Sequence, residues 1–184
     1  MPLSPPAARA PIHTREVVCH GFRRDDGLWD IEGRLSDTKA YPFENQFRGR
    51  IEPGEPLHAM AMRLTVDEDL RVVDVEAASD AGPYALCPAI VGNFRRLIGL
   101  KIGPGWRRAV LERVGGVQGC THLVELLWPM ATAAYQTLYP VLARKADPER
   151  RPALLDSCHV FARSGEVARE QWPRWYEPVA EPAG

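Results

Sequence analysis

Apolar and polar residues alternate along the first half of the chain. In "LWDIEGRL", Trp29, Ile31 and Leu35 fall on one face, and the charged residues between them fall on the other. A period of two residues is typical of a half-buried β-strand. The segments "REVVCHGF", "HAMAMRLTV" and "LRVVDVEA" predict three more strands, and the break "DED" between the last two predicts a hairpin.

The period changes to 3.6 residues near residue 85, which predicts helices in the second half. "CPAIVGNFRRLIG" carries one apolar stripe between Pro88 and Gly99, and "PGWRRAVLERVGG" repeats this pattern up to Gly115. We therefore predict an α+β fold, in which an antiparallel sheet from the N-terminal half is covered on one face by helices from the C-terminal half. Strands should dominate residues 15 to 78, and helices should dominate residues 88 to 140.

The longest apolar segment is "CTHLVELLWPMATAAYQTLYPVLA", with Pro129 inside it. Proline removes a helical hydrogen bond and clashes with the preceding turn, so we expect a kink or a break there. A last helix is predicted to begin with Ser164 as its cap and to end before Pro173.

The distribution of prolines suggests the domain limits. Residues 1–11 hold four of the seventeen prolines and are predicted to be disordered or extended. Residues 12–172 are predicted to form a single α+β domain, and residues 173–184 a C-terminal tail.

Composition excludes some classes of partner. The formal charge is −1, with 23 basic and 24 acidic residues, so no general attraction to nucleic acid or to anionic lipid is expected. No stretch approaches the ~20 apolar residues of a membrane helix. The N-terminus lacks the apolar core of a signal peptide, and we therefore expect a cytoplasmic protein with reduced thiols.

The stretch "GCTHLVEL" combines a thiol, an imidazole and a carboxylate. If a helix begins near Thr121, Cys120 and His122 lie at its positive end, which favours thiolates and anions. His122 and Glu125 then share a helical face. The structural alternative is a capped helix with a small buried thiol.

Further candidates lie where strands begin or end. His58 opens a strand after Pro56, and its imidazole suits proton transfer near neutral pH, although a lone histidine is more often structural. Asp80, Tyr84 and Cys87 lie in the crossing from the sheet to the first helix, where sites are common. An Asx turn and a packed tyrosine would explain the same residues.

Charged residues beside aromatic ones give candidate substrate contacts. Arg24 is a candidate to hold an anionic or phenolic oxygen, with Trp29 as an apolar wall, although "DDG" is also a good turn. Asp37 and Lys39 are either a surface ion pair or a base and a cation at a pocket edge. His13 precedes the first strand and either folds over the sheet or projects freely.

Several known motifs are missing, including GxGxxG after a strand, the phosphate-binding loop, GxSxG and HExxH. The four cysteines form no CxxC pair. The sequence therefore predicts no nucleotide cofactor, and the expected site contains no metal.

A family resemblance adds to this reading. "HTRE", "RRDDGLWDIEGRLSDTK", "GEPLHAMAMRLTVDEDL", "IGPGW" and "GCTHLVELL", in this order, resemble the bacterial DUF2889 family of unknown function over roughly residues 12 to 140. The order of sheet and helices, with a cysteine at a helix start, is also similar to iron–sulfur scaffold proteins. Those proteins use three cysteines, and no third one can be placed beside Cys87 and Cys120.

The predicted function is a small enzyme that performs lyase-like acid/base cleavage of a small aromatic or carbonyl-bearing metabolite. His58, His122 or Asp80 would act as the base, with Cys120 beside them. Arg24, Lys39 or Tyr84 would stabilise the developing oxyanion. The alternatives are a metal or iron–sulfur protein that uses Cys87, Cys120 and His122, and a non-catalytic ligand-binding module. A homodimer is compatible with each.

Overall fold

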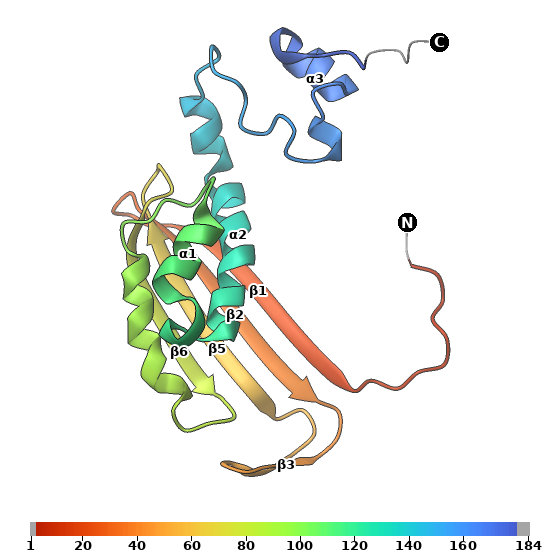
Figure 1. The fold of residues 1–184 in the computed structure, drawn as a ribbon, viewed down its shortest axis with the longest axis vertical. Helices are drawn as coiled ribbons and strands as arrows, with labels where there is room; N and C mark the ends of the chain where they lie inside the picture. The colour runs from red at the N-terminus through yellow and green to blue at the C-terminus, as the bar shows by residue number, and fades with distance from the viewer. Residues whose placement is uncertain (1–2, 180–184) are drawn as a thin grey trace. The chain divides into compact units, whose positions relative to one another are not determined.

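A computed structural model describes residues 3–179 of the chain. Four strands form an antiparallel sheet in the order β1-β2-β5-β6, and two short strands, β3 and β4, form a separate hairpin between β2 and β5 (Figure 1). The bounds are β1 His13–Arg23, β2 Trp29–Lys39, β3 Phe43–Asn45, β4 Gly49–Ile51, β5 Pro56–Val66 and β6 Val72–Ala81. The four strands and the β5–β6 hairpin confirm the sequence-based prediction, whereas the β3–β4 hairpin was not predicted.

Helices follow the sheet in the chain. They are η1 Cys87–Leu97, α1 Trp106–Val114, η2 Gly116–Gln118, α2 Thr121–Lys145, η3 His159–Phe161, α3 Glu166–Gln171 and η4 Pro173–Trp175. The α+β class is thus confirmed, with the antiparallel sheet first and the helices second. None of the helices in residues 3–179 combines the length and the apolar character needed to cross a bilayer.

The chain divides into two compact units, Met1–Pro140 and Val141–Gly184. The first contains the sheet, η1, α1 and most of α2, and the second contains η3, α3 and η4. Residues 3–11 form no helix or strand, and residues 180–184 of the predicted tail lie outside the described residues. The limits proposed from the sequence, at residues 11 and 172, stay predictions.

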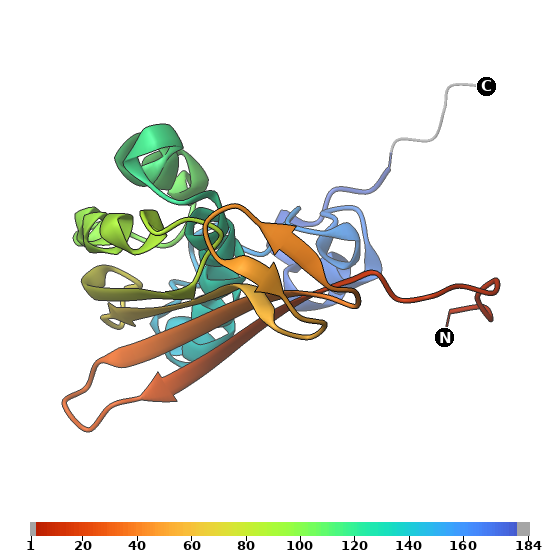
Figure 2. The same cartoon turned by 90° about the horizontal axis from the view of Figure 1, so that it is seen from below.

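The core of the first unit lies between one face of the sheet and the helices of the same unit (Figure 2). Ile31 and Leu35 of β2 point to this covered face and are buried, while Arg34 between them is exposed. α2 approaches the sheet closely because Gly33 has no side chain, so that Met130 and Leu126 occupy the space where a Cβ would lie. The predicted alternation along β2 therefore selects the covered face correctly.

Three helical details differ from the prediction. The N-cap of α3 is Gly165, without a side-chain cap hydrogen bond, and not Ser164. η1 is a 3₁₀ helix, and its two buried residues, Phe94 and Leu97, are three apart, which is the repeat that aligns side chains in a 3₁₀ helix. α2 runs without a break through Pro129, so a break at that residue is wrong. Buried neighbours on both sides of Pro129, Leu127 and Met130, hold the helix against the core and offset the lost hydrogen bond.

Gly21 of β1 gives a test of the contact between sheet and α2. A Cβ at Gly21 would lie 1.9 Å from Thr137 Oγ1 and 2.7 Å from Thr137 Cβ, so rotating the threonine cannot remove the clash. We expect Gly21→Ala to lower the free energy of unfolding by ~1–3 kcal/mol, measured by chemical denaturation. Gly92→Ala is the matched control, because no atom lies within 4 Å of its Cβ position. A Gly21→Ala protein as stable as the wild type would contradict this packing.

Candidate metal centre

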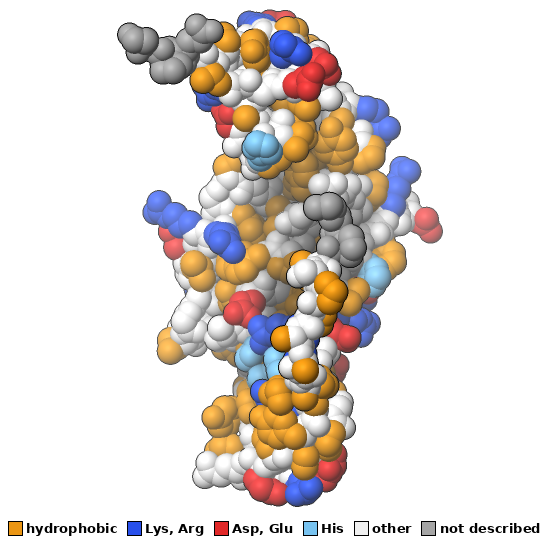
Figure 3. Space-filling model, turned by 90° about the vertical axis from the view of Figure 1, so that its right-hand side faces the viewer, with side chains coloured by type: hydrophobic (Ala, Val, Ile, Leu, Met, Phe, Trp, Pro, Cys, Tyr) orange, Lys and Arg blue, Asp and Glu red, His pale blue; other side chains and the backbone are white. Residues whose placement is uncertain are grey.

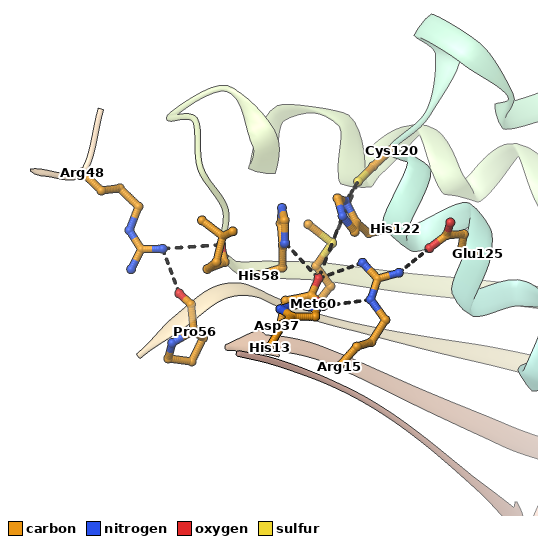
Figure 4. A network of polar contacts seen from close by, with 11 residues as sticks. His13, Arg15, Asp37, Arg48, Pro56, His58, Met60, Cys120, His122 and Glu125 are labelled. Carbon is orange, nitrogen blue, oxygen red and sulfur yellow. Dashed lines mark hydrogen bonds and ion pairs between the residues drawn. The ribbon is translucent and has the colours of Figure 1, made fainter. Parts of the chain in front are cut away.

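A carboxylate lies on the apolar, covered face of the sheet. Asp37 follows Ile31 and Leu35 on the same face of β2, and its side chain is only 2% exposed. A buried carboxylate needs charged or hydrogen-bonding partners, because an isolated buried charge is very unfavourable. The partners of Asp37 come from β1, from β5 and from the start of α2 (Figure 4).

The strand register places two of these partners directly beside Asp37. Arg15 of β1 and His58 of β5 are its cross-strand neighbours, so the three side chains form a row across the sheet. Arg15 binds the carboxylate with two hydrogen bonds of 2.8 Å, from Nε to Oδ1 and from Nη2 to Oδ2. His13, at the beginning of β1, contacts Oδ1 at 3.2 Å through Nε2.

Two histidines face the other carboxylate oxygen. His58 Nδ1 lies 3.0 Å from Asp37 Oδ2, and His122 Nε2 lies 4.0 Å from the same atom. The two imidazole rings lie with their centroids 3.9 Å apart and their planes tilted by 32°. Two protonated imidazoles would repel each other strongly at this distance, so a charge on both rings at once is disfavoured.

The surroundings also set the charge of the groups. Hydrogen bonds from Arg15 hold the pKa of Asp37 below its usual value, against the opposing effect of burial. Burial lowers the pKa of His58, and the neighbouring His122 lowers it further, although Asp37 acts in the opposite direction. The cluster therefore contains an ionised carboxylate beside a neutral imidazole, which are the forms that bind metal ions.

The start of α2, at Thr121, completes the cluster. Cys120 immediately precedes the helix, and its Sγ lies 3.9 Å from His122 Nδ1 and 3.9 Å from Met60 Sδ. Glu125, one turn further along, accepts a 2.7 Å hydrogen bond from Arg15 Nη1. Arg15 thus joins the carboxylate in the sheet to a second carboxylate on the helix.

Three of these side chains could hold a metal ion. One potential ligand atom from each of Asp37, His58 and His122 lies within 4.8 Å of the other two. Two imidazoles and one carboxylate are a ligand set that suits zinc and iron and leaves coordination positions open. Cys87 and Cys120, the thiols of the alternative metal site considered from the sequence, are not members of this group.

The other predicted site residues are distributed over both ends of the sheet. Arg24 forms an ion pair with Asp26 at 2.6 Å in the β1–β2 turn, and Trp29 begins β2 beneath Arg23. Trp29 lies about 26 Å from Asp37 along β2, at roughly 3.3 Å per residue, and Arg24 lies in the turn before β2. The structure therefore does not bring Arg24 and Trp29 together with the cluster.

The remaining candidates lie at the same end of the sheet as Asp37. Lys39 is the last residue of β2, paired with His13 of β1, and Asp80 is an exposed residue at a bulge near the end of β6. Tyr84 lies in the following loop, and Cys87 begins η1. Among the site residues predicted from the sequence, His58 and His122 belong to the metal-binding group, and Cys120 contacts His122.

No site role was predicted for Arg15 from the sequence, and alternatives remained open for Asp37 and His13. A signal for Asp37 was present, because an acid at position 37 shares the face of Ile31 and Leu35. The sequence does not indicate which residues lie beside Asp37, because this depends on how β1, β2 and β5 pair.

The fold and this cluster define an α+β protein with a potential two-histidine, one-carboxylate metal centre. The model of the family described as "Protein of unknown function (DUF2889)" matches residues 13–136, and the chain belongs to this family. The matched range includes every member of the cluster from His13 to Glu125. Comparisons with curated proteins and with solved structures gave no match.

Removing Arg15 tests how far the cluster depends on it. In an Arg15→Met protein, Asp37 keeps its buried position but loses two charged hydrogen bonds, so we expect the free energy of unfolding at pH 7 to fall by ~1.5–3 kcal/mol. Arg63→Met is the control, because Arg63 also binds two carboxylates, Glu32 and Glu76, but on the exposed face. There we expect a loss of no more than ~1 kcal/mol. Equal losses in the two variants would contradict a special role for Arg15.

Proposed function

We propose that this protein is a metal-dependent enzyme that acts on a small carbonyl-bearing metabolite. Asp37, His58 and His122 would be the protein ligands of a divalent transition-metal ion, with zinc and ferrous iron as the best candidates. The observation that carries this proposal is the convergence of three ligand atoms within 4.8 Å on a buried face of the sheet. Arg15 and His13, both in β1, would bind the same carboxylate and fix its position.

The ligand set would suit a lyase-like reaction. Three protein ligands leave coordination positions for a water molecule and for the substrate carbonyl. An ion held by Asp37, His58 and His122 would lower the pKa of bound water and polarise the carbonyl, and this would favour loss of a proton from the adjacent carbon and departure of a leaving group.

The neighbours of the ligands suit this role. Liganding carboxylates and histidines in metal sites are commonly fixed by a second set of hydrogen bonds. Arg15 provides them for Asp37 and is itself held by Glu125, while Cys120 lies beside the second ring nitrogen of His122. This proposal departs from the sequence-based expectation of a site without metal.

A second candidate is an acid/base enzyme that works without metal, as the sequence first suggested. The 3.0 Å contact between His58 Nδ1 and Asp37 Oδ2 favours it, since a carboxylate at Nδ1 leaves Nε2 of a neutral ring free to accept a proton. In both versions we expect a cytoplasmic enzyme that takes a small-molecule substrate and does not bind nucleic acid, and a homodimer is compatible with either.

Metal binding separates the two candidates without knowledge of the substrate. We expect the full-length chain, purified without a histidine tag, to bind one zinc or ferrous ion per molecule by elemental analysis and by calorimetric titration. Asp37→Asn, His58→Gln and His122→Gln should each weaken metal binding by at least ~100-fold, because loss of a group that only hydrogen-bonds to a metal ligand already costs roughly 10–100-fold.

Two other histidines provide the controls. His20, on the same β1 strand as His13, and His159, in the second unit, are exposed and outside the metal-binding group. His20→Gln and His159→Gln should bind metal as the wild type does. Circular dichroism of each ligand variant would show that the fold is retained. Wild-type protein that binds neither ion, or ligand variants that bind as tightly as the controls, would reject the metal centre and leave the acid/base candidate.

A further inference from the structure

Exposed apolar side chains lie at the end of the sheet that carries the metal-binding group. We call them the apolar rim: Ile12 (58% exposed), Tyr41 (43%), Phe47 (57%), Tyr84 (55%) and Leu86 (81%). Figure 3 shows histidine side chains of the first unit next to a continuous group of hydrophobic side chains. Large apolar residues gathered at one site on a surface indicate a binding surface more often than isolated ones do.

The topology explains why these residues meet. In an antiparallel sheet, the beginning of β1, the end of β2, the beginning of β5 and the end of β6 all lie at one end. Ile12 precedes β1, Tyr41 follows β2, and Tyr84 and Leu86 follow β6. Asp37 and His58 are near the same end of β2 and β5, so the rim and the ligands belong to one region.

Phe47 is held in this region by polar contacts of its neighbours. It lies in the turn between β3 and β4, where its backbone N–H donates to Asn45 Oδ1 at 3.0 Å. The adjacent Arg48 donates a 2.8 Å hydrogen bond to the carbonyl of Pro56, two residues before His58 (Figure 4). The β3–β4 hairpin is therefore fastened to the strand that carries a metal-binding histidine.

Phe47 and Tyr84 form an aromatic pair across two loops. Their ring centroids are 4.9 Å apart in an edge-on arrangement, and both residues remain more than half exposed. The loop of Tyr84 begins after Ala81, which pairs with Ala59, the residue next to His58. An aromatic pair that is ordered but exposed presents a ready surface for another flat apolar group.

We infer that the apolar rim, with Phe47 and Tyr84 at its centre, binds the aromatic body of the substrate while an oxygen group of the same molecule reaches the metal. This inference rests on the metal centre proposed above and adds the substrate class to it. Small-molecule sites combine mainly apolar walls with a few polar groups that fix orientation, and the rim and the cluster together have this composition. The substrate is thus an aromatic compound with a metal-binding oxygen substituent.

Two hydroxamates test the inference, because they carry the same metal-binding group on different bodies. We expect zinc-loaded protein to bind benzohydroxamate at least tenfold more tightly than acetohydroxamate in calorimetric titrations. In the Phe47→Ala/Tyr84→Ala double variant, the ratio of the two dissociation constants should fall to threefold or less. Acetohydroxamate binding should stay as in the wild type, because its methyl group does not depend on the aromatic pair.

Phe22→Ala is the matched control. Phe22 is 48% exposed, but it lies toward the other end of β1. That end is about 30 Å from His13 at roughly 3.3 Å per residue. This variant should keep the wild-type preference for benzohydroxamate.

A wild-type protein without the preference, or a double variant that retains it, would overturn the role of the rim while the metal centre stands. If neither hydroxamate binds the zinc-loaded chain, the metal centre fails, and the inference about the rim fails with it.

Discussion

The site depends on one interaction, the paired hydrogen bonds between Arg15 and Asp37. They allow a carboxylate that is 2% exposed to remain ionised on the apolar face of a sheet. An ionised carboxylate there attracts His13, His58 and His122 from three different elements. Without the guanidinium, the same position would favour a neutral acid, which is a poor partner for histidine and a poor metal ligand.

The fold builds this interaction from three constraints that act together. The register sets Arg15, Asp37 and His58 side by side on β1, β2 and β5. Gly33 lets α2 settle on the same face of β2, and the start of the helix then brings His122 and Glu125 over the row. The end of the sheet is left with a polar centre inside an apolar rim, an arrangement suited to a small molecule with one polar head.

The periodicity of apolar residues was sufficient to predict most elements of the fold. The four long strands, the β5–β6 hairpin and α1, with its buried Trp106, Val110 and Val114, follow from periods of two and 3.6 residues. The β3–β4 hairpin was missed because strands of three residues are too short to show a period. The continuity of α2 through Pro129 depends on tertiary packing, which local propensity does not contain.

Several residues of the site could be predicted one by one from the sequence, but their convergence in one cluster could not. His58, His122 and Cys120 were recognised from their places at the beginnings of elements, and the structure brings them together. The alternation along the strand places the acid Asp37 on an apolar face. Its role, however, depends on Arg15, which lies 22 residues away and becomes a neighbour only through strand pairing. Arg24 and Trp29 looked equally suitable in the sequence, and only the direction of β2 separates them from the cluster.

X-ray absorption spectroscopy at the zinc edge of the reconstituted protein would identify the atoms that bind the ion. We expect a first shell of nitrogen and oxygen atoms at about 2.0–2.2 Å, with the outer-shell signal of two imidazole rings and no sulfur. A sulfur neighbour at about 2.3 Å would mean that a cysteine such as Cys120 binds the ion, and it would contradict a centre built from Asp37, His58 and His122.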